Sequence, residues 1–192
     1  HNIKFSISNS PKGVLDVVFC AWINESALTV EQKIELARSA IERYPNAWDV
    51  IASKLPHGTS SICSTLNTPK YRRIDEPEEL YAHEVNKTYI EYLRMCIDRA
   101  YTGADRWIKI LQHVKPYDIN IQKEVFEKLV FICKKMNDEE KIRIKNEIRY
   151  EIFRHRYFED ADWSMPQEVL HEYECVMNKI VVGEKIYDYL YI

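Results

Sequence analysis

The stretch from Arg149 to His155 (RYEIFRH) holds two residue types that could act on a phosphodiester. A guanidinium binds phosphate oxygens in bidentate fashion, and an imidazole transfers protons near neutral pH. On a helix, however, six residues turn the second side chain about 240° away from the first. A chain with 27 basic residues and six histidines also meets such a spacing easily by chance. We therefore expect a solvated, charged helix face here and keep a nuclease as an alternative.

Other groupings of reactive residues are sparser. His171 and Cys175 lie four apart and could share one helix face. A zinc site needs four donors, or three and a water, and no second pair has ligand spacing. The run from Gly58 to Ser61 (GTSS) lacks the GxxxxGK[ST] pattern of a phosphate-binding loop. We therefore expect no metal and no other cofactor.

The densest basic cluster lies near the end of a stretch from 56 to 75 that has no helical period, and comprises Lys70, Tyr71, Arg72 and Arg73. The turn residues of that stretch predict a long loop. The three cations could contact an acidic protein surface, a phosphorylated partner or RNA. Alternatively, they pair with the acidic residues at 75–79. This cluster is the candidate partner-binding site of the chain.

Composition excludes several classes of protein. The chain has 192 residues and a net charge of −3, which gives no general attraction for nucleic acid. No apolar run approaches the ~20 residues that span a bilayer, so no membrane contact is expected. Five scattered cysteines without a CxxC pair indicate reduced, buried thiols in a cytoplasmic protein. The chain lacks an initial Met and ends in an aromatic run, from which we expect a fragment of a larger protein.

Helix signals run through the sequence. Thr29 and Gln32 form a capping-box pattern, and Pro45 ends the helix that they open. Asn46 is expected to cap a short helix that contains Trp48. These two helices predict an αα-hairpin in which Trp48 is buried.

Further helices are expected along the rest of the chain. One begins near Pro11 and a long one runs from Asp75 to Gly103. An apolar stripe that ends in Ile152 and Phe153 marks another. The expected starts of the later helices are Asp105, Asn120, Asn137 or Asp138, Pro166 and Glu184.

The total is eight or nine helices and no strand, so the sequence predicts an all-α fold. Short Pro, Asn and Asp turns favour antiparallel packing of successive helices. We expect an irregular α-solenoid of stacked antiparallel helix pairs, similar to TPR or HEAT arrays, in a single domain over residues 1–192.

Several short strings together resemble the C-terminal helical region of large bacterial STAND-type nucleotidases, which carry an N-terminal effector and some of which are implicated in antiphage defence. The strings are Phe19–Trp22 (FCAW), Ile41–Pro45 (IERYP), Ala47–Trp48, Leu55–Pro56, Thr68–Arg72 (TPKYR) and Phe158–Pro166 (FEDADWSMP). Ala21 replaces the proline of the family pattern, and the histidine of its central string is missing. The resemblance implies a repeat tail that senses a foreign protein or restrains the effector.

The function expected is that of a non-enzymatic helical-repeat interaction module, the sensor or scaffold segment of a larger bacterial protein, with a protein partner. Two alternatives stay open. One is a ribonuclease, because Arg149 and His155 resemble the Rx(4–6)H motif of HEPN ribonucleases, although Tyr150 stands where that motif is usually polar. The other is an RNA-binding array that uses the patch from Lys70 to Arg73.

Overall fold

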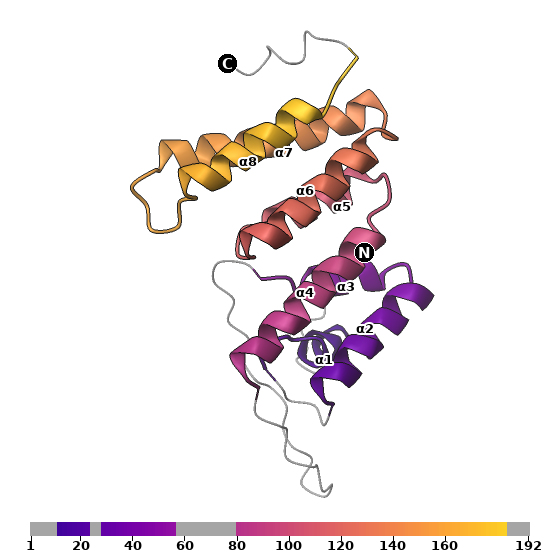
Figure 1. Cartoon of the computed structure of the whole chain (residues 1–192). Helices are drawn as coiled ribbons and strands as arrows, with labels where there is room; N and C mark the ends of the chain where they lie inside the picture. Colours follow the sequence, from indigo (N-terminus) through magenta and orange to yellow (C-terminus); the bar gives the residue numbers. More distant parts are fainter. Residues whose placement is uncertain (1–10, 24–27, 57–79, 184–192) are drawn as a thin grey trace, which may run out of the picture. The chain divides into compact units, whose positions relative to one another are not determined.

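The computed structural model describes residues 11–23, 28–56 and 80–183 of the chain (Figure 1). Within those ranges it comprises eight α-helices and no strand, so the predicted all-α class is confirmed for them. The chain divides into two compact units, residues 1–96 and 97–192. The single domain over residues 1–192 stays a prediction.

The two units contain the helices in chain order. The first holds α1 (Pro11–Val18), α2 (Val30–Arg43), α3 (Ala47–Ala52) and most of α4 (Ala82–Asp98). The second holds α5 (Ala104–Val114), α6 (Ile119–Cys133), α7 (Asp138–Tyr157) and α8 (Gln167–Lys179). Three predictions lie outside the described residues: the patch from Lys70 to Arg73 with nearly all of its loop, and the helix starts at Asp75 and Glu184.

Local sequence sets both ends of α2. Thr29 Oγ1 accepts a hydrogen bond from the Gln32 backbone N–H at 3.2 Å, and Gln32 Oε1 accepts one from the Thr29 N–H at 3.0 Å. The predicted capping box is therefore confirmed. The helix ends at Arg43 because Tyr44, which precedes Pro45, has an extended backbone (φ −125°, ψ 113°). The chain then turns into α3, which packs against α2.

Trp48 and Lys33 place polar groups in the interior of the first unit, each against defined partners. Trp48 is only 2% exposed, as predicted, and its Nε1 donates to the Cys96 carbonyl at 2.9 Å. Lys33 is buried as well, and its Nζ donates to the carbonyls of Cys20 at 2.9 Å and Ile23 at 3.3 Å. Burial lowers the pKa of Lys33. Trp48 thus satisfies a carbonyl in the last turn of α4, and Lys33 satisfies two carbonyls in the segment after α1.

The second unit is built from two helical hairpins. Helix α5 packs against α6 and α7, and α8 packs against α6 and α7. Figure 1 shows α7 and α8 side by side, joined at one end by the loop at residues 158–166. The first hairpin, α5 with α6, therefore lies against the second, α7 with α8.

Three helix boundaries differ from the prediction. Asp118, rather than Asn120, caps α6 by accepting from the Asn120 N–H at 2.8 Å. Helix α5 follows Gly103 at the N-cap, so Asp105 lies in its first turn. Helix α4 ends at Asp98, before Gly103, and is followed by a turn in which Tyr101 has a positive φ of 50°. Of the two predicted starts of α7, Asn137 or Asp138, the structure has Asn137 as the N-cap, because its side chain accepts from the Glu140 N–H at 2.9 Å.

Apolar residues from all four helices fill the interior of the second unit, among them Trp107, Ile110, Leu111, Val125, Leu129, Ile144, Ile148 and Tyr173. The prediction that Phe153 belongs to this apolar stripe is wrong, since it is 65% exposed. It directly follows the buried Ile152, and one residue of helix turns a side chain by about 100°. In the described part of the chain, no helix combines the length and hydropathy needed to cross a bilayer.

Candidate functional site

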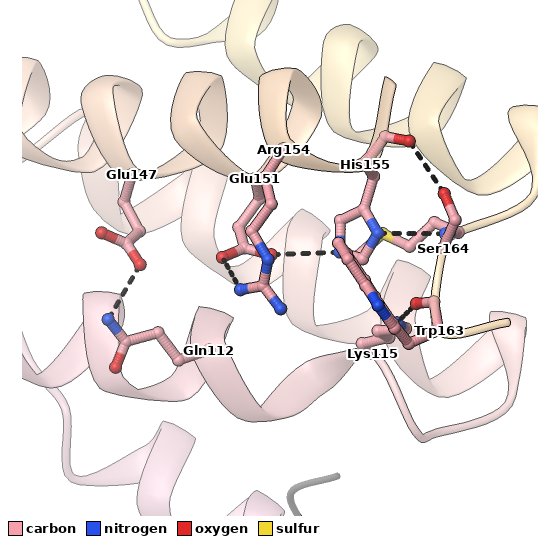
Figure 2. Close-up of polar contacts among 9 residues, drawn as sticks. Gln112, Lys115, Glu147, Glu151, Arg154, His155, Trp163 and Ser164 are labelled. Atoms are coloured by element: carbon pink, nitrogen blue, oxygen red, sulfur yellow. Dashed lines mark hydrogen bonds and ion pairs between the residues drawn. The ribbon is translucent and has the colours of Figure 1, made fainter. Parts of the chain in front are cut away.

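A polar cluster of the second unit surrounds His155, near the end of α7 (Figure 2). This side chain is 1% exposed. Its Nδ1 accepts a hydrogen bond from the Met165 backbone N–H at 3.1 Å, and its carbonyl accepts one from Ser164 Oγ at 2.8 Å. His155 therefore fastens the loop at 158–166 to the end of α7.

These contacts determine where the ring carries its proton. A backbone N–H can only donate, so Nδ1 presents a lone pair and the proton of the neutral ring lies on Nε2. Nε2 is 3.3 Å from Glu151 Oε2, although the contact is not aligned as a hydrogen bond. Burial, followed by the charges of Lys115 and Arg154, lowers the pKa of His155 to about 4, and burial raises the pKa of Glu151. His155 is therefore neutral at pH 7.

Trp163 covers this cluster. Its ring meets the His155 ring edge-on with centroids 5.2 Å apart, and the Arg154 guanidinium carbon lies 4.9 Å from its centroid. Lys115 Nζ lies 5.7 Å from the same ring and donates to the Trp163 carbonyl. The string Phe158–Pro166, which carries part of the family resemblance, thus forms a clamp over α5 and α7. Its contacts connect the end of α5, at Lys115, with the last turn of α7.

The structure does not bring Arg149 and His155 together. Arg149 Nη1 donates to Asn146 Oδ1 at 3.3 Å, and the side chain lines a groove between α7 and α8 that His155 does not line. Both ring nitrogens of His155 face protein groups in a buried site. A general acid or base must reach the proton that it transfers. This geometry therefore gives the nuclease alternative no support.

Two other reactive groups lie in the described part of the second unit, the His171 and Cys175 pair and the buried Cys133. Cys175 Sγ lies 3.6 Å from His171 Nε2, and His171 Nδ1 lies 3.7 Å from Glu174 Oε2. Across the residues that the structure describes, no three His, Cys, Asp or Glu side chains gather as metal ligands do. Burial raises the pKa of the Cys133 thiol to about 11, which makes it a poor nucleophile.

Large aromatic side chains lie exposed along α7. Tyr150, Phe153 and Tyr157 are 57%, 65% and 69% exposed. Their spacing places them within about 60° of one another around the helix. Phe153 and Tyr157 stack with centroids 5.7 Å apart, and Phe158 meets Tyr157 edge-on at 4.8 Å. We call these four residues the aromatic face.

A groove of about 440 Å³ runs beside the aromatic face, between α7 and α8. Phe153 and Tyr157 form one wall, Met177 of α8 contributes apolar surface, and Arg149 and Arg156 add positive charge. Arg156 forms an ion pair with Glu174 of α8, which links the two helices across the groove. Sequence patterns did not predict this surface, because they place Phe153 on an apolar stripe and do not single out Tyr150 or Tyr157 as exposed.

Comparisons with known proteins do not assign this chain to a family. No family model, curated protein or solved structure matches the chain. The resemblance to STAND-type nucleotidases therefore stays a prediction from the sequence.

Proposed function

We propose that this chain is a non-enzymatic interaction module of the helical-repeat type, which binds a protein partner through the aromatic face of α7. The observation that carries this proposal is a row of three aromatic side chains, each more than half exposed, on one stripe of a helix. Contiguous exposed apolar surface of this kind marks interaction sites. Tyr and Arg, the residue types in and beside this face, are enriched at interface hot spots.

The packing of the second unit supports the repeat architecture. In a solenoid of helical hairpins, the first helix of one pair packs on the first helix of the next, and the second helix on the second. The contacts of α5 with α7 and of α6 with α8 follow this rule. We propose on this basis an irregular α-solenoid similar to TPR or HEAT arrays, serving as the sensor or scaffold segment of a bacterial STAND-type protein.

A reducing, cytoplasmic setting fits this proposal. Cys20, Cys96 and Cys133 are free thiols in the interior of the two units. Free thiols persist where the compartment keeps cysteines reduced.

Capture from a lysate of the source cell tests the aromatic face. The chain is tagged and compared with the variant Phe153→Ser/Tyr157→Ser and with the control Tyr44→Ser/Tyr101→Ser, which removes two exposed aromatics elsewhere. We expect the wild type and the control to retain the same proteins and the first variant to lose them. Equal retention by all three chains would contradict the proposal.

Incubation with labelled single-stranded RNA tests the non-enzymatic assignment. We expect no cleavage by the purified chain. Cleavage that disappears in both Arg149→Ala and His155→Ala would overturn the proposal and restore the nuclease alternative.

Filter binding over a range of salt concentrations tests the RNA-binding alternative, because phosphate contacts make affinity fall steeply with salt.

A further inference from the structure

A second groove, between α6 and α8, has a different chemistry from the aromatic face. Its volume is about 390 Å³. The floor consists of the buried Phe126 and Val176 with the half-buried Val130, and Phe131, 55% exposed, lies at its edge. A groove of this size with this floor has room for one or two bulky apolar side chains of a ligand.

Lysines dominate the rim of this groove. Lys123 Nζ lies 3.3 Å from Glu172 Oε1, an ion pair that joins α6 to α8. Lys134 and Lys179 line the groove too, and neither has an acidic partner among the residues that the structure describes. The only further acid on the lining is Glu127. The rim therefore carries an excess of positive charge on a chain whose net charge is −3.

Helix ends explain part of this charge. Lys134 is the C-cap of α6 and Lys179 is the last residue of α8, positions where a cation offsets the helix dipole. That effect does not account for the exposed apolar surface between the lysines. Lys135 adds a further cation, with Nζ 5.2 Å from the Phe131 ring centroid. The apolar floor and the cationic rim together fit a ligand that has both apolar and anionic groups.

We propose that this groove, which we call the lysine groove, binds an acidic peptide segment of a protein partner. One or two bulky apolar side chains of the segment contact Phe126, Val130 and Phe131. Its carboxylates pair with Lys134 and Lys179. The floor favours a peptide over RNA, because successive bases need several exposed rings to stack on and this lining exposes one, Phe131, beside the buried Phe126 and aliphatic side chains. This surface is separate from the aromatic face and does not depend on it.

Selection from a library of short random peptides tests the proposal. The intact chain is the bait, and the selected peptides are then measured by fluorescence anisotropy. We expect enrichment of peptides that combine Asp or Glu with a bulky apolar residue, and affinities that fall as salt rises. Enrichment of neutral or basic peptides, or no enrichment above background, would overturn the proposal.

Paired charge reversals locate the binding site. Lys134→Glu/Lys179→Glu is compared with Lys87→Glu/Lys128→Glu, which makes the same charge change at two half-exposed lysines outside the groove. We expect the first pair to weaken peptide binding by about tenfold and the control to leave it unchanged. Peptides whose acids are replaced by Lys should then recover affinity for the first variant. Equal binding to both variants would refute the assignment.

Two further variants separate this site from the proposed function. Phe131→Ser removes an exposed ring at the groove edge and should weaken the selected peptides, whereas Phe153→Ser/Tyr157→Ser should not. Binding that responds to the second change instead would place the peptides on the aromatic face and overturn the lysine groove while leaving the proposed function intact. Competition by single-stranded RNA for the same lysines would also overturn it.

Discussion

Acidification should destabilise this protein through His155. His155 Nδ1 accepts a hydrogen bond from the Met165 N–H. Protonation of Nδ1 would place two N–H donors against each other in a buried site. Glu151 faces the ring on α7, while Lys115 and Arg154 are the cations whose charges further lower its pKa. The neutral ring is thus the form that holds the loop at 158–166.

The magnitude follows from the difference between the folded and unfolded pKa values. The folded pKa of His155 is about 4 against an ordinary value of 6.5, so the unfolded chain binds the proton more tightly. The stabilising effect is fully present above the unfolded value and is lost as the pH falls from about 6.5 toward about 4. The full shift gives a loss of about 2 kcal/mol between about pH 7 and about pH 5. Solvent screening of Lys115 and Arg154 reduces this to about 1–2 kcal/mol.

Urea unfolding at a series of pH values measures this effect, with His155→Asn as the reference. The asparagine oxygen can accept from the Met165 N–H and does not titrate, so the difference between the two profiles isolates the histidine. This reference is needed because Glu151 titrates too. Burial raises the pKa of Glu151, so its contribution to stability is present at low pH and is lost as the pH rises through its folded-state pKa. That change is opposite in direction to the change from His155. Parallel profiles of the two proteins from about pH 7 to about pH 5 would refute the reasoning.

Three further predictions concern the interior and one helix end. Trp48→Ala should lower the free energy of unfolding by about 3–5 kcal/mol, and Trp48→Phe by about 1–2 kcal/mol because it removes the hydrogen bond to Cys96 but keeps most of the buried ring; a Trp48→Phe variant as stable as the parent in urea titrations would contradict a contribution from that bond. Thr29→Ala should cost about 1 kcal/mol by removing the capping box, and an unchanged thermal midpoint would show that the box contributes nothing. Cys175 should react with iodoacetamide in the folded protein, while Cys133 should react only in urea; equal labelling rates by mass spectrometry would contradict the burial of Cys133.

Local signals in the sequence predicted the helices well where the cause is itself local. The capping box at Thr29 and the stop before Pro45 each depend on groups within four residues, and both are confirmed; of the two starts offered for α7, the structure selects Asn137. The cap of α6 was misplaced by two residues because Asn120 and Asp118 are both good caps, and only the backbone geometry selects between them.

Side-chain environments were less predictable. Tyr150, Phe153 and Tyr157 are aromatic residues at helical spacing, a pattern typical of a buried stripe, and yet they lie exposed. The periodicity gives the angle between side chains on a helix but not which side another helix covers. The sequence also could not show that a lysine such as Lys179 lies in a groove without an acidic partner among the described residues. Whether a lysine finds a partner on another helix depends on how the helices pack.

The sequence by itself determined the all-α class of the described residues, most helix positions and the burial of Trp48, because helix propensity, caps and prolines act over a few residues. Only the tertiary structure decided what His155 does. In the sequence, His155 stands six residues after Arg149, a spacing that indicates phosphate chemistry. In the structure, the loop at 158–166 returns over α7, and the Met165 backbone N–H donates a hydrogen bond to the His155 ring. That return brings together groups ten residues apart, and the chemistry of a side chain depends on the atoms that packing places around it.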